Sequence, residues 1–324
     1  MSMTEPLILK AALHEKMWGG TALADVFGFD IPSDTTGEAW LISGHPNGPV
    51  TVENGKYAGR TVAELWHDEP QLFGNQDTSR PFPLLVKLLD AHQDLSVQVH
   101  PDDVYAGEHA NGELGKTESW YIVSAEPGAE IYYGHTAQTK AEFDAAVDAG
   151  DWESLLRRVP VKAGDFFYVP AGTLHALGAG VLALETQQSS DVTYRVYDFD
   201  RVDAKSGQLR ELHLADAKNV TSVPFVPERP EQRSATYAGL TVTTLVEAPY
   251  FNVYKWGVDG RATIDARAPY LLGTVLDGEL NLTVFGVTYQ LAKGDSFILP
   301  NDVEAWTLQG QAQLITSTPG PKSM

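Results

Sequence analysis

The residues best suited to metal chemistry lie in three separate segments of the chain. Residues 96–100 read SVQVH, where strand alternation places Gln98 and His100 on one face and two valines on the other. Glu118 and His175 each lie beside sequence rich in β-forming residues. Two imidazoles, a carboxylate and an amide oxygen suit zinc or another divalent first-row ion. The pattern predicts an open catalytic site, although Gln98 or His100 alone is more typical of an ordinary polar residue inside a barrel.

An internal repeat predicts the scaffold that gathers these residues. The block VKAGDFFYVP (161–170) matches LAKGDSFILP (291–300) at an offset of 130 positions. Upstream, Gly128 matches Gly278 at an offset of 150, so the first copy has 20 more residues between its two blocks. Short alternating strands with Gly, Asp and Pro turns indicate a mainly β fold of two cupin-like jelly-roll barrels, a bicupin.

The extra residues of the first copy have a helical pattern. The stretch TKAEFDAAVDAGDWESLLRR predicts a short helical insertion at about 136–159. Thr139 and Glu142 have the spacing of a capping box, and Leu155 and Arg158 follow helical spacing. The first barrel is therefore expected to carry a helical addition that the second barrel lacks.

The length of the chain and a proline-rich segment predict two domains. A chain of 324 residues favours two modules, and residues 221–234 are the best linker. We expect a catalytic domain at 1–225, which includes N-terminal elements and the helical insertion. The C-terminal cupin-like domain, 226–324, is expected to lack metal ligands. Another capping box, Thr61 with Glu64, predicts a small helix beside the first barrel.

The second copy of the repeat provides an internal control for the metal site. With the two offsets, Ala305 lies opposite His175 and Ala268 lies opposite Glu118. If the fold itself required polar side chains at these positions, the second copy should retain them. Their presence in the first copy alone favours a metal site there.

Composition and charge exclude several classes of function. The chain has 23 basic and 43 acidic residues, a net charge of −20 that repels nucleic acid and anionic membranes. It has no cysteine, which fits a reducing compartment. No secretory signal and no membrane-spanning stretch is recognisable. We therefore expect a cytoplasmic protein with a small-molecule ligand, and the sequence predicts no protein partner.

Several ordered segments carry a resemblance to a known family. The segments FPLLVKLLDA, LSVQVHPDD, GKTESWYIV, VPAGTLHAL and LETQQSSDVTYRVYDFDR resemble class I mannose-6-phosphate isomerases, particularly the short bacterial form. The resemblance covers about the first two thirds of the chain, and the C-terminal part agrees more weakly. It implies one zinc ion per chain, held by Gln98, His100, Glu118 and His175, the residues grouped above.

The resemblance also implies an activity and further site residues. Enzymes of this family interconvert mannose 6-phosphate and fructose 6-phosphate by moving a proton between C1 and C2 through an enediol(ate). Arg195 in TYRVYD is implied to be an active-site residue that stabilises the enediolate or binds phosphate, and Lys116 and Lys87 to line the substrate pocket. A structural ion pair of Arg195 with Asp191 or Asp198 is the alternative.

The general base and the function itself each have alternatives at this point. Glu185 in LALETQQ is a catalytic candidate, but Lys116, a zinc-bound water or a purely structural Glu185 fit as well. Two histidines and a carboxylate also suit an iron-dependent cupin oxygenase. A non-catalytic sugar-binding bicupin would use the fold without turnover. The remaining histidines are expected on the surface or in the core, including His45, His92, His109 and His213.

Overall fold

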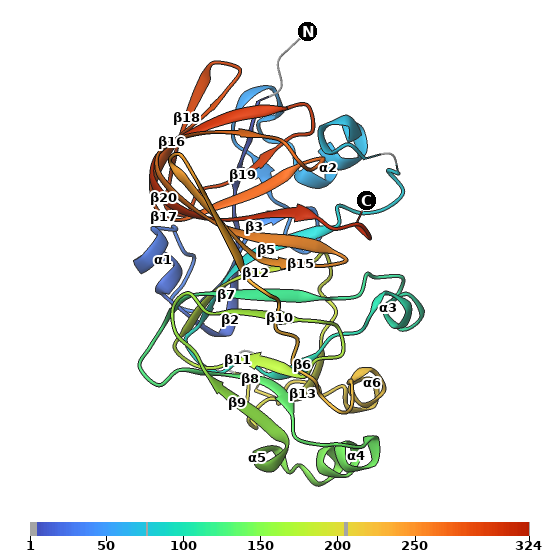
Figure 1. Cartoon of the computed structure of the whole chain (residues 1–324). Helices are drawn as coiled ribbons and strands as arrows, with labels where there is room; N and C mark the ends of the chain where they lie inside the picture. Colours follow the sequence, from blue (N-terminus) through green and yellow to red (C-terminus); the bar gives the residue numbers. More distant parts are fainter. Residues whose placement is uncertain (1–4, 76, 204–206, 324) are drawn as a thin grey trace.

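The computed structural model describes residues 5–75, 77–203 and 207–323, and its strands form three sheets (Figure 1). The six-stranded sheet has the spatial order β10 (Phe166–Val169), β7 (Glu118–Ala125), β12 (Val181–Gln188), β5 (Leu84–Ala91), β3 (Thr36–Ser43), β2 (Ala12–Gly20). The five-stranded sheet has the order β13 (Tyr194–Tyr197), β6 (Val97–Val99), β11 (His175–Leu177), β8 (Glu130–His135), β9 (Leu156–Pro160).

The third and largest sheet has nine strands and contains most of the C-terminal part of the chain. Its order is β14 (Arg233–Tyr237), β15 (Leu240–Glu247), β16 (Phe251–Asp265), β20 (Ala305–Pro319), β17 (Leu271–Val284), β19 (Ser296–Leu299), β1 (Leu7–Lys10), β4 (Thr51–Val52), with β18 (Val287–Ala292) paired to β17. The mainly β prediction is confirmed. The described strands form open sheets with free edges rather than two closed barrels.

Short helices cover the edges and ends of the sheets. They are α1 (Ala22–Phe27), α2 (Val62–Asp68), α3 (Asp103–His109), α4 (Lys140–Ala149), α5 (Trp152–Leu155) and α6 (Leu214–Val220), with the 3₁₀ turns η1 (Gly55–Tyr57) and η2 (Pro70–Phe73). None of the helices in the described part of the chain has the length and apolar composition that crossing a membrane requires. Figure 1 shows α4, α5 and α6 together at the end of the molecule away from the nine-stranded sheet.

The internal repeat is visible in the backbone. Gly164 and Gly294 both have positive φ, 92° and 97°, a region that favours glycine. The carboxylate of the following aspartate, Asp165 or Asp295, accepts the backbone N–H three residues before it, at 2.9 and 2.8 Å. Each turn leads into a four-residue strand, β10 or β19. The Gly-Asp signal therefore identified the same turn in both copies.

The strand register corrects one residue of the repeat comparison. Val169 pairs with Glu118, and Leu299, its counterpart 130 positions later, pairs with Leu271. The structural counterpart of Glu118 is therefore Leu271 and not Ala268. The offset of 150 was taken from Gly128 and Gly278. The pairing of β17 with β20 is irregular between Val275 and Asp277, just before Gly278, so the offset does not carry back to the start of the strand. The position in the second copy is apolar in either alignment.

The predicted helical insertion is partly confirmed. Thr139 and Glu142 form both hydrogen bonds of a capping box at the start of α4, and Thr61 and Glu64 form another at the start of α2. The helical assignment of the end of the insertion, at 156–159, is wrong. These residues belong to β9, which pairs with β8, because the edge of the five-stranded sheet offers backbone partners that a short helix cannot match.

The N-terminal segment contributes to two sheets. β1 pairs with β19, with Leu7 opposite Ile298 and Leu9 opposite Ser296, and β4 pairs with β1. β2 and β3 then join the six-stranded sheet. The predicted division at residue 225 falls in the segment before β14 and stays a prediction.

The site residues are positioned by the six-stranded and five-stranded sheets, which pack on one another. One hydrophobic cluster contains Trp120, Ile122 and Ala183 from the first sheet and Val97 and Ala176 from the second, together with other buried residues. Polar side chains on the facing surfaces of β6, β11, β7, β12 and β5 can therefore converge between the two sheets.

The shared turn gives a test of the fold. Because Gly164 has φ of 92° and an added Cβ would meet no atom within 4 Å, Gly164→Ala isolates backbone strain and should reduce the free energy of unfolding by about 1–3 kcal/mol. Gly294→Ala should cost at least as much, since its Cβ would lie 3.2 Å from the Phe27 carbonyl. The control, Gly257→Ala, has ordinary φ and open space, and should change stability by less than about 0.5 kcal/mol. Urea unfolding measures all three, and equal effects of the variants at 164 and 257 would contradict the shared turn.

Candidate active site and metal centre

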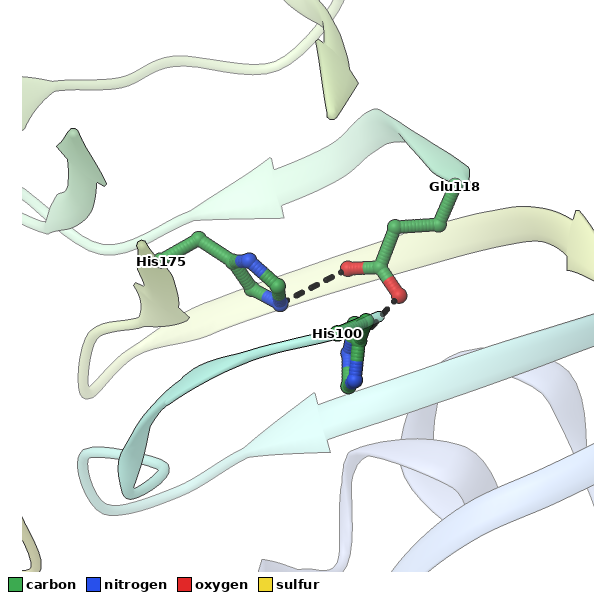
Figure 2. Close-up of side chains that lie close together, drawn as sticks. All are labelled: His100, Glu118 and His175. Carbon is green, nitrogen blue, oxygen red and sulfur yellow. Dashed lines mark ion pairs between the residues drawn. The ribbon is translucent and has the colours of Figure 1, made fainter. Parts of the chain in front are cut away.

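Three buried side chains converge between the two sheets (Figure 2). His175 Nε2 lies 3.1 Å from Glu118 Oε1, and His100 Nε2 lies 3.4 Å from Glu118 Oε2. All three residues are at most 1% exposed, and their ligand atoms lie within 4.8 Å of one another. Glu118 begins β7 and His175 begins β11, while His100 follows β6 directly. The structure therefore brings together three residues that are far apart in the chain.

Both histidines are oriented by backbone carbonyl groups. His100 Nδ1 lies 2.8 Å from the Val192 carbonyl, and His175 Nδ1 lies 2.8 Å from the Thr173 carbonyl. Because a carbonyl can only accept, each Nδ1 carries the hydrogen, and a neutral ring then directs the lone pair of Nε2 toward Glu118. Burial and the charge of Lys116 lower the pKa of His100 to about 3, which keeps this ring neutral.

The three residues fit a divalent metal ion. Within the described residues, His100 Nε2 and both Glu118 oxygens are buried and have no hydrogen-bond partner, an arrangement that is costly without a ligand. Two atoms that each lie about 2.1 Å from one tetrahedral ion are roughly 3.4 Å apart. The observed separations of 3.1 and 3.4 Å agree with this value. Nitrogen and carboxylate donors suit first-row divalent ions.

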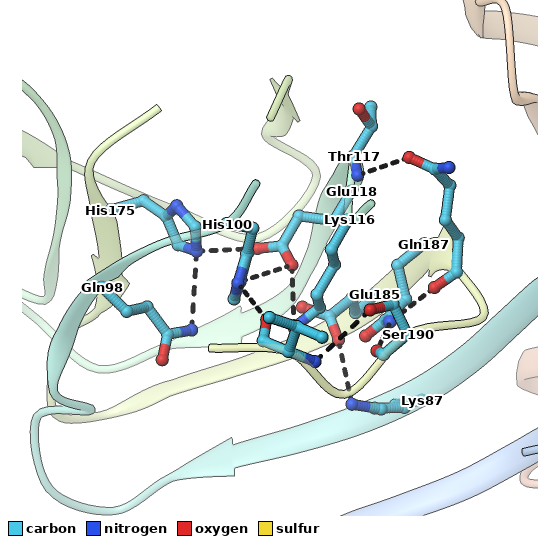
Figure 3. Close-up of polar contacts among 12 residues, drawn as sticks. Lys87, Gln98, His100, Lys116, Thr117, Glu118, His175, Glu185, Gln187 and Ser190 are labelled. Carbon is cyan, nitrogen blue, oxygen red and sulfur yellow. Dashed lines mark hydrogen bonds and ion pairs between the residues drawn. The ribbon is translucent and has the colours of Figure 1, made fainter. Parts of the chain in front are cut away.

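Gln98 is the fourth predicted ligand and lies beside the triad (Figure 3). It pairs with His175 across β6 and β11, and its Nε2 is 3.5 Å from His175 Nε2. Rotation of the amide by a half-turn would exchange Nε2 and Oε1. The oxygen, which is the atom that ligates a metal, would then face the triad. Gln98 is half-buried, whereas the other three are buried. The open side of the site therefore lies toward Gln98.

Lys116 places a cation against the triad. Its ammonium lies 3.3 Å from Glu118 Oε2, and the side chain is buried. Burial alone would raise the pKa of Glu118, but the charge of Lys116 holds that pKa well below the usual range. Burial would lower the pKa of Lys116, but Glu118 and Glu185 reverse the direction and raise it. The pair is therefore an ionised carboxylate and a protonated ammonium.

Lys87 and Glu185 form a second buried pair on the same face of the six-stranded sheet. They are cross-strand partners on β5 and β12, with Lys87 Nζ 3.6 Å from Glu185 Oε2. The indole N–H of Trp120 donates to Glu185 Oε1 at 3.0 Å. Burial and then the charge of Glu118 raise the pKa of Glu185, against the opposing effect of the two lysines. Glu185 is thus a buried carboxylate close to the triad that is not one of its members.

Arg195 lies next to Gln98, and both residues are half-buried. It pairs with Gln98 across β13 and β6, so His175, Gln98 and Arg195 follow one another across three adjacent strands. Its guanidinium donates to Ser96 Oγ at 3.3 Å and to the Glu211 carbonyl at 2.9 Å. Within the described residues it forms no ion pair with Asp191 or Asp198.

The alternative role for Arg195, a structural ion pair, is therefore not observed. Asp198 is bound instead by Arg201 and Arg210, with contacts of 2.6 and 2.5 Å. The contacts of Arg195 to a hydroxyl and a carbonyl do not neutralise its charge. Arg195 is therefore a half-buried cation without a carboxylate partner at Asp191 or Asp198 in the described part of the chain.

Comparison with known proteins now identifies the family. Residues 7–124 match the model for the phosphomannose isomerase type I catalytic domain, and residues 241–319 match that for the mannose-6-phosphate isomerase cupin domain. Mannose-6-phosphate isomerase ManA of Bacillus subtilis is 52% identical over 314 residues, which are 97% of this chain and 99% of that protein. The chain belongs to the mannose-6-phosphate isomerase family. The mannose-6-phosphate isomerase of Streptococcus mutans is also 52% identical, over 97% of this chain and 98% of its own length.

Solved structures of this family agree with the fold. The crystal structure of mannose 6-phosphate isomerase from Bacillus subtilis superimposes with a TM-score of 0.93 at 50% identity, covering 97% of this chain and 99% of that one. A variant of phosphomannose isomerase from Salmonella typhimurium gives a TM-score of 0.77 at 15% identity over 98% of this chain and 100% of that one, which supports the fold alone.

Two features near the site were not singled out from the sequence. Trp40 and Glu38 lie on β3, on the side of Lys87 that is away from Glu185, and both are buried. Their strand, TGEAWLIS, is buried along its whole length and shows no clear alternation that would separate the two faces. The sequence signal that could have identified these residues was Glu38, a charged residue in a strand that is otherwise largely apolar.

The histidines that were expected outside the site do not join the triad. His92 and His109 are exposed. His45 is buried beside Trp40, with ring centroids 5.7 Å apart. His213 accepts the backbone N–H of Arg195 at 3.2 Å, so it contributes indirectly to the position of that residue.

Metal binding can be tested directly. His175→Ala should lower the affinity for a divalent ion by more than the roughly 10–100-fold that the loss of an outer-shell partner costs in metal proteins. The exposed His92→Ala is the matched control and should retain the metal. Elemental analysis after dialysis measures both, and stoichiometric metal in the His175 variant would contradict the assignment.

Proposed function

We propose that the chain interconverts mannose 6-phosphate and fructose 6-phosphate by proton transfer between C1 and C2, with one zinc ion per chain. Family membership supports the substrates and the reaction. The observation that carries the proposal is the buried triad of His100, Glu118 and His175 beside two buried lysines and a further buried carboxylate. This arrangement provides the two requirements of an aldose–ketose isomerase, a proton acceptor and stabilisation of negative charge on oxygen.

The proposed metal ligands are His100, Glu118 and His175, with Gln98 as the fourth. A bound zinc ion would supply Lewis acidity that stabilises negative charge on a sugar oxygen. The two Nδ1 hydrogen bonds to backbone carbonyls hold the imidazoles in the tautomer that this ligation needs. The half-buried positions of Gln98 and Arg195 support entry of the substrate from their side.

We assign Glu185 as the general base. Its Oε1 is held by the Trp120 indole, and its Oε2, which lies 3.6 Å from the Lys87 ammonium, is the oxygen that would take a proton from the substrate. Glu185 lies diagonally from Glu118 on adjacent strands, because the register pairs Gln187 with Glu118. Burial raises the pKa of Glu185, and a general base is most effective when its pKa approaches the working pH.

The cations stabilise the enediolate and bind the phosphate. Lys116 lies against the triad, where the reacting carbons would be, so we assign it to the developing oxyanion. Lys87 is a buried ammonium on the same face as Glu185, and we assign it to substrate binding. The planar guanidinium of Arg195 suits the phosphate or the enediolate at the opening of the site. Because the net charge of the chain repels an anionic substrate, binding would depend on these cations.

A coupled assay tests the activity. The zinc-loaded chain should convert mannose 6-phosphate to fructose 6-phosphate, which is detected by oxidation of glucose 6-phosphate after a second isomerase. Absence of turnover with full metal occupancy would refute the proposed function. Oxygen uptake by iron-loaded protein would instead support the oxygenase alternative.

Substitution of the proposed base gives a sharper test. Glu185→Gln should lower kcat by about 10²–10⁴, because the amide keeps the shape and the Trp120 contact but cannot accept the proton. Metal content should not change. Glu279→Gln, an exposed glutamate on the nine-stranded sheet, is the matched control. A kcat of the Glu185 variant within a few fold of the parent would transfer the base role to another group.

A further inference from the structure

Lys87 carries a positive charge where charge is costly. The residue is 3% exposed, and its strand β5 is buried along its length. Within the described residues, its ammonium contacts Glu185 Oε2 at 3.6 Å and the face of the Trp40 ring at 4.5 Å from the centroid. The distance to Glu185 exceeds that of a direct charged hydrogen bond, which is about 2.7–2.9 Å. The carboxylate alone therefore does not fix this flexible side chain.

The strand register places the ammonium between two partners. Lys87 is opposite Glu185 on β12 and opposite Trp40 on β3, so the three side chains lie on one face of adjacent strands. An ammonium over an indole face is attracted by the negative centre of the ring. The ammonium therefore lies between the ring face and the carboxylate, and it forms no close ion pair with Glu185.

Trp40 is itself held by a charged residue. Its indole N–H donates to Glu38 Oε2 at 2.7 Å, and Glu38 Oε1 lies 3.3 Å from the ammonium of Lys16. Burial opposes ionisation of Glu38, but Lys87 and Lys16 outweigh it and lower its pKa to about 2. An anion that accepts the indole N–H also makes the ring face more negative. Glu38 therefore fixes the ring and strengthens its attraction for Lys87.

The rest of the environment leaves the ring little freedom. The His14 ring lies 4.9 Å from the Trp40 ring, and the His45 ring 5.7 Å, measured between centroids. A Cβ added to Gly48 would lie 2.3 Å from Trp40 Cε3, so the backbone of that loop packs directly on the indole. Trp40 is 2% exposed. Its position is determined by the fold and does not depend on a ligand.

We propose that Trp40, anchored by Glu38, is a positioning residue that holds the Lys87 ammonium for an oxygen of the phosphosugar and keeps it from closing on Glu185. The inference rests on the substrate-binding role proposed above for Lys87. Neither Trp40 nor Glu38 is assigned contact with the substrate. Their effect on catalysis acts through Lys87.

The test is a double-mutant cycle on KM and kcat for mannose 6-phosphate. Trp40→Leu should raise KM about tenfold, an effect between those of an exposed and a fully desolvated cation–π contact, with kcat within about threefold. Trp40→Phe keeps a ring face and should recover part of this loss. In a Lys87→Met background, Trp40→Leu should add less than about twofold. The same tenfold effect in both backgrounds would overturn the proposal, because Trp40 would then act independently of Lys87.

A second pair of variants covers the case in which Trp40→Leu does not fold. Glu38→Ala removes the acceptor of the indole N–H and should raise KM several-fold, and Glu38→Gln, which keeps an acceptor, should recover most of it. An unchanged KM in Glu38→Ala would contradict the anchoring role. Trp256→Leu, a similarly buried tryptophan on the nine-stranded sheet, is the control and should leave KM unchanged.

The cycle also separates this inference from the proposed function. If the parent chain does not turn over mannose 6-phosphate, the proposed function fails, and the same four chains are compared by the midpoint of urea unfolding. Non-additive shifts for Lys87→Met and Trp40→Leu would support the contact between them. Additive shifts would contradict it.

Discussion

The buried carboxylate of Glu118 is the constraint on which the arrangement of the site depends. A fully buried anion is tolerated only when a cation compensates it, and here Lys116 lies against Glu118 while His100 and His175 turn their Nε2 atoms to the same carboxylate. The histidines come from or directly follow strands of the five-stranded sheet, whereas Glu118 and Lys116 belong to or precede β7 of the six-stranded sheet. The environment of the Glu118 carboxylate is therefore complete only when the two sheets pack on one another.

Buried charges of alternating sign continue from Glu118 across the six-stranded sheet. Glu118 faces Lys116, Glu185 faces Lys87, and the Trp40 ring beyond Lys87 is bound to Glu38. Each buried charge reduces the cost of its neighbour, so the removal of one member disturbs the ionisation of the next. The site is better described as one network than as a metal centre with separate catalytic residues. The second copy of the repeat has an apolar residue, Leu271, where this network begins.

The sequence predicted those parts of the structure that depend on local pattern. The period of two in SVQVH placed Gln98 and His100 on one face, and Gly-Asp identified the repeated turn. Features that depend on pairing between distant segments were missed. The segment at 156–159 is a strand because β8 offers an edge, and Leu271 is the counterpart of Glu118 because a register irregularity shifts the alignment. Neither fact leaves a local signal.

In the candidate site too, local patterns were predictable from the sequence, whereas contacts between distant segments were not. The family resemblance indicated both Lys87 and Arg195, and Lys87 also interrupts the apolar run FPLLVKLLD, where a charged residue stands out. Whether Arg195 would pair with Asp198 could not be decided from spacing, since the outcome depends on Arg201 and Arg210 competing for the same carboxylate. The contact of Trp40 with Lys87 depends on the register of β3 against β5, which a strand buried on both faces does not reveal.

The pairing of β1 with β19 has a consequence for how the chain acquires its structure. Leu7–Lys10 is synthesised long before its partner, Ser296–Leu299, because the two strands lie far apart in the chain. β4 can pair with one edge of β1 early, but the edge that faces β19 stays unpaired until the long loop closes, and closing so long a loop is slow. The large sheet is therefore completed late, and a fragment that contains only the C-terminal strands would expose the edge of β19 to other chains.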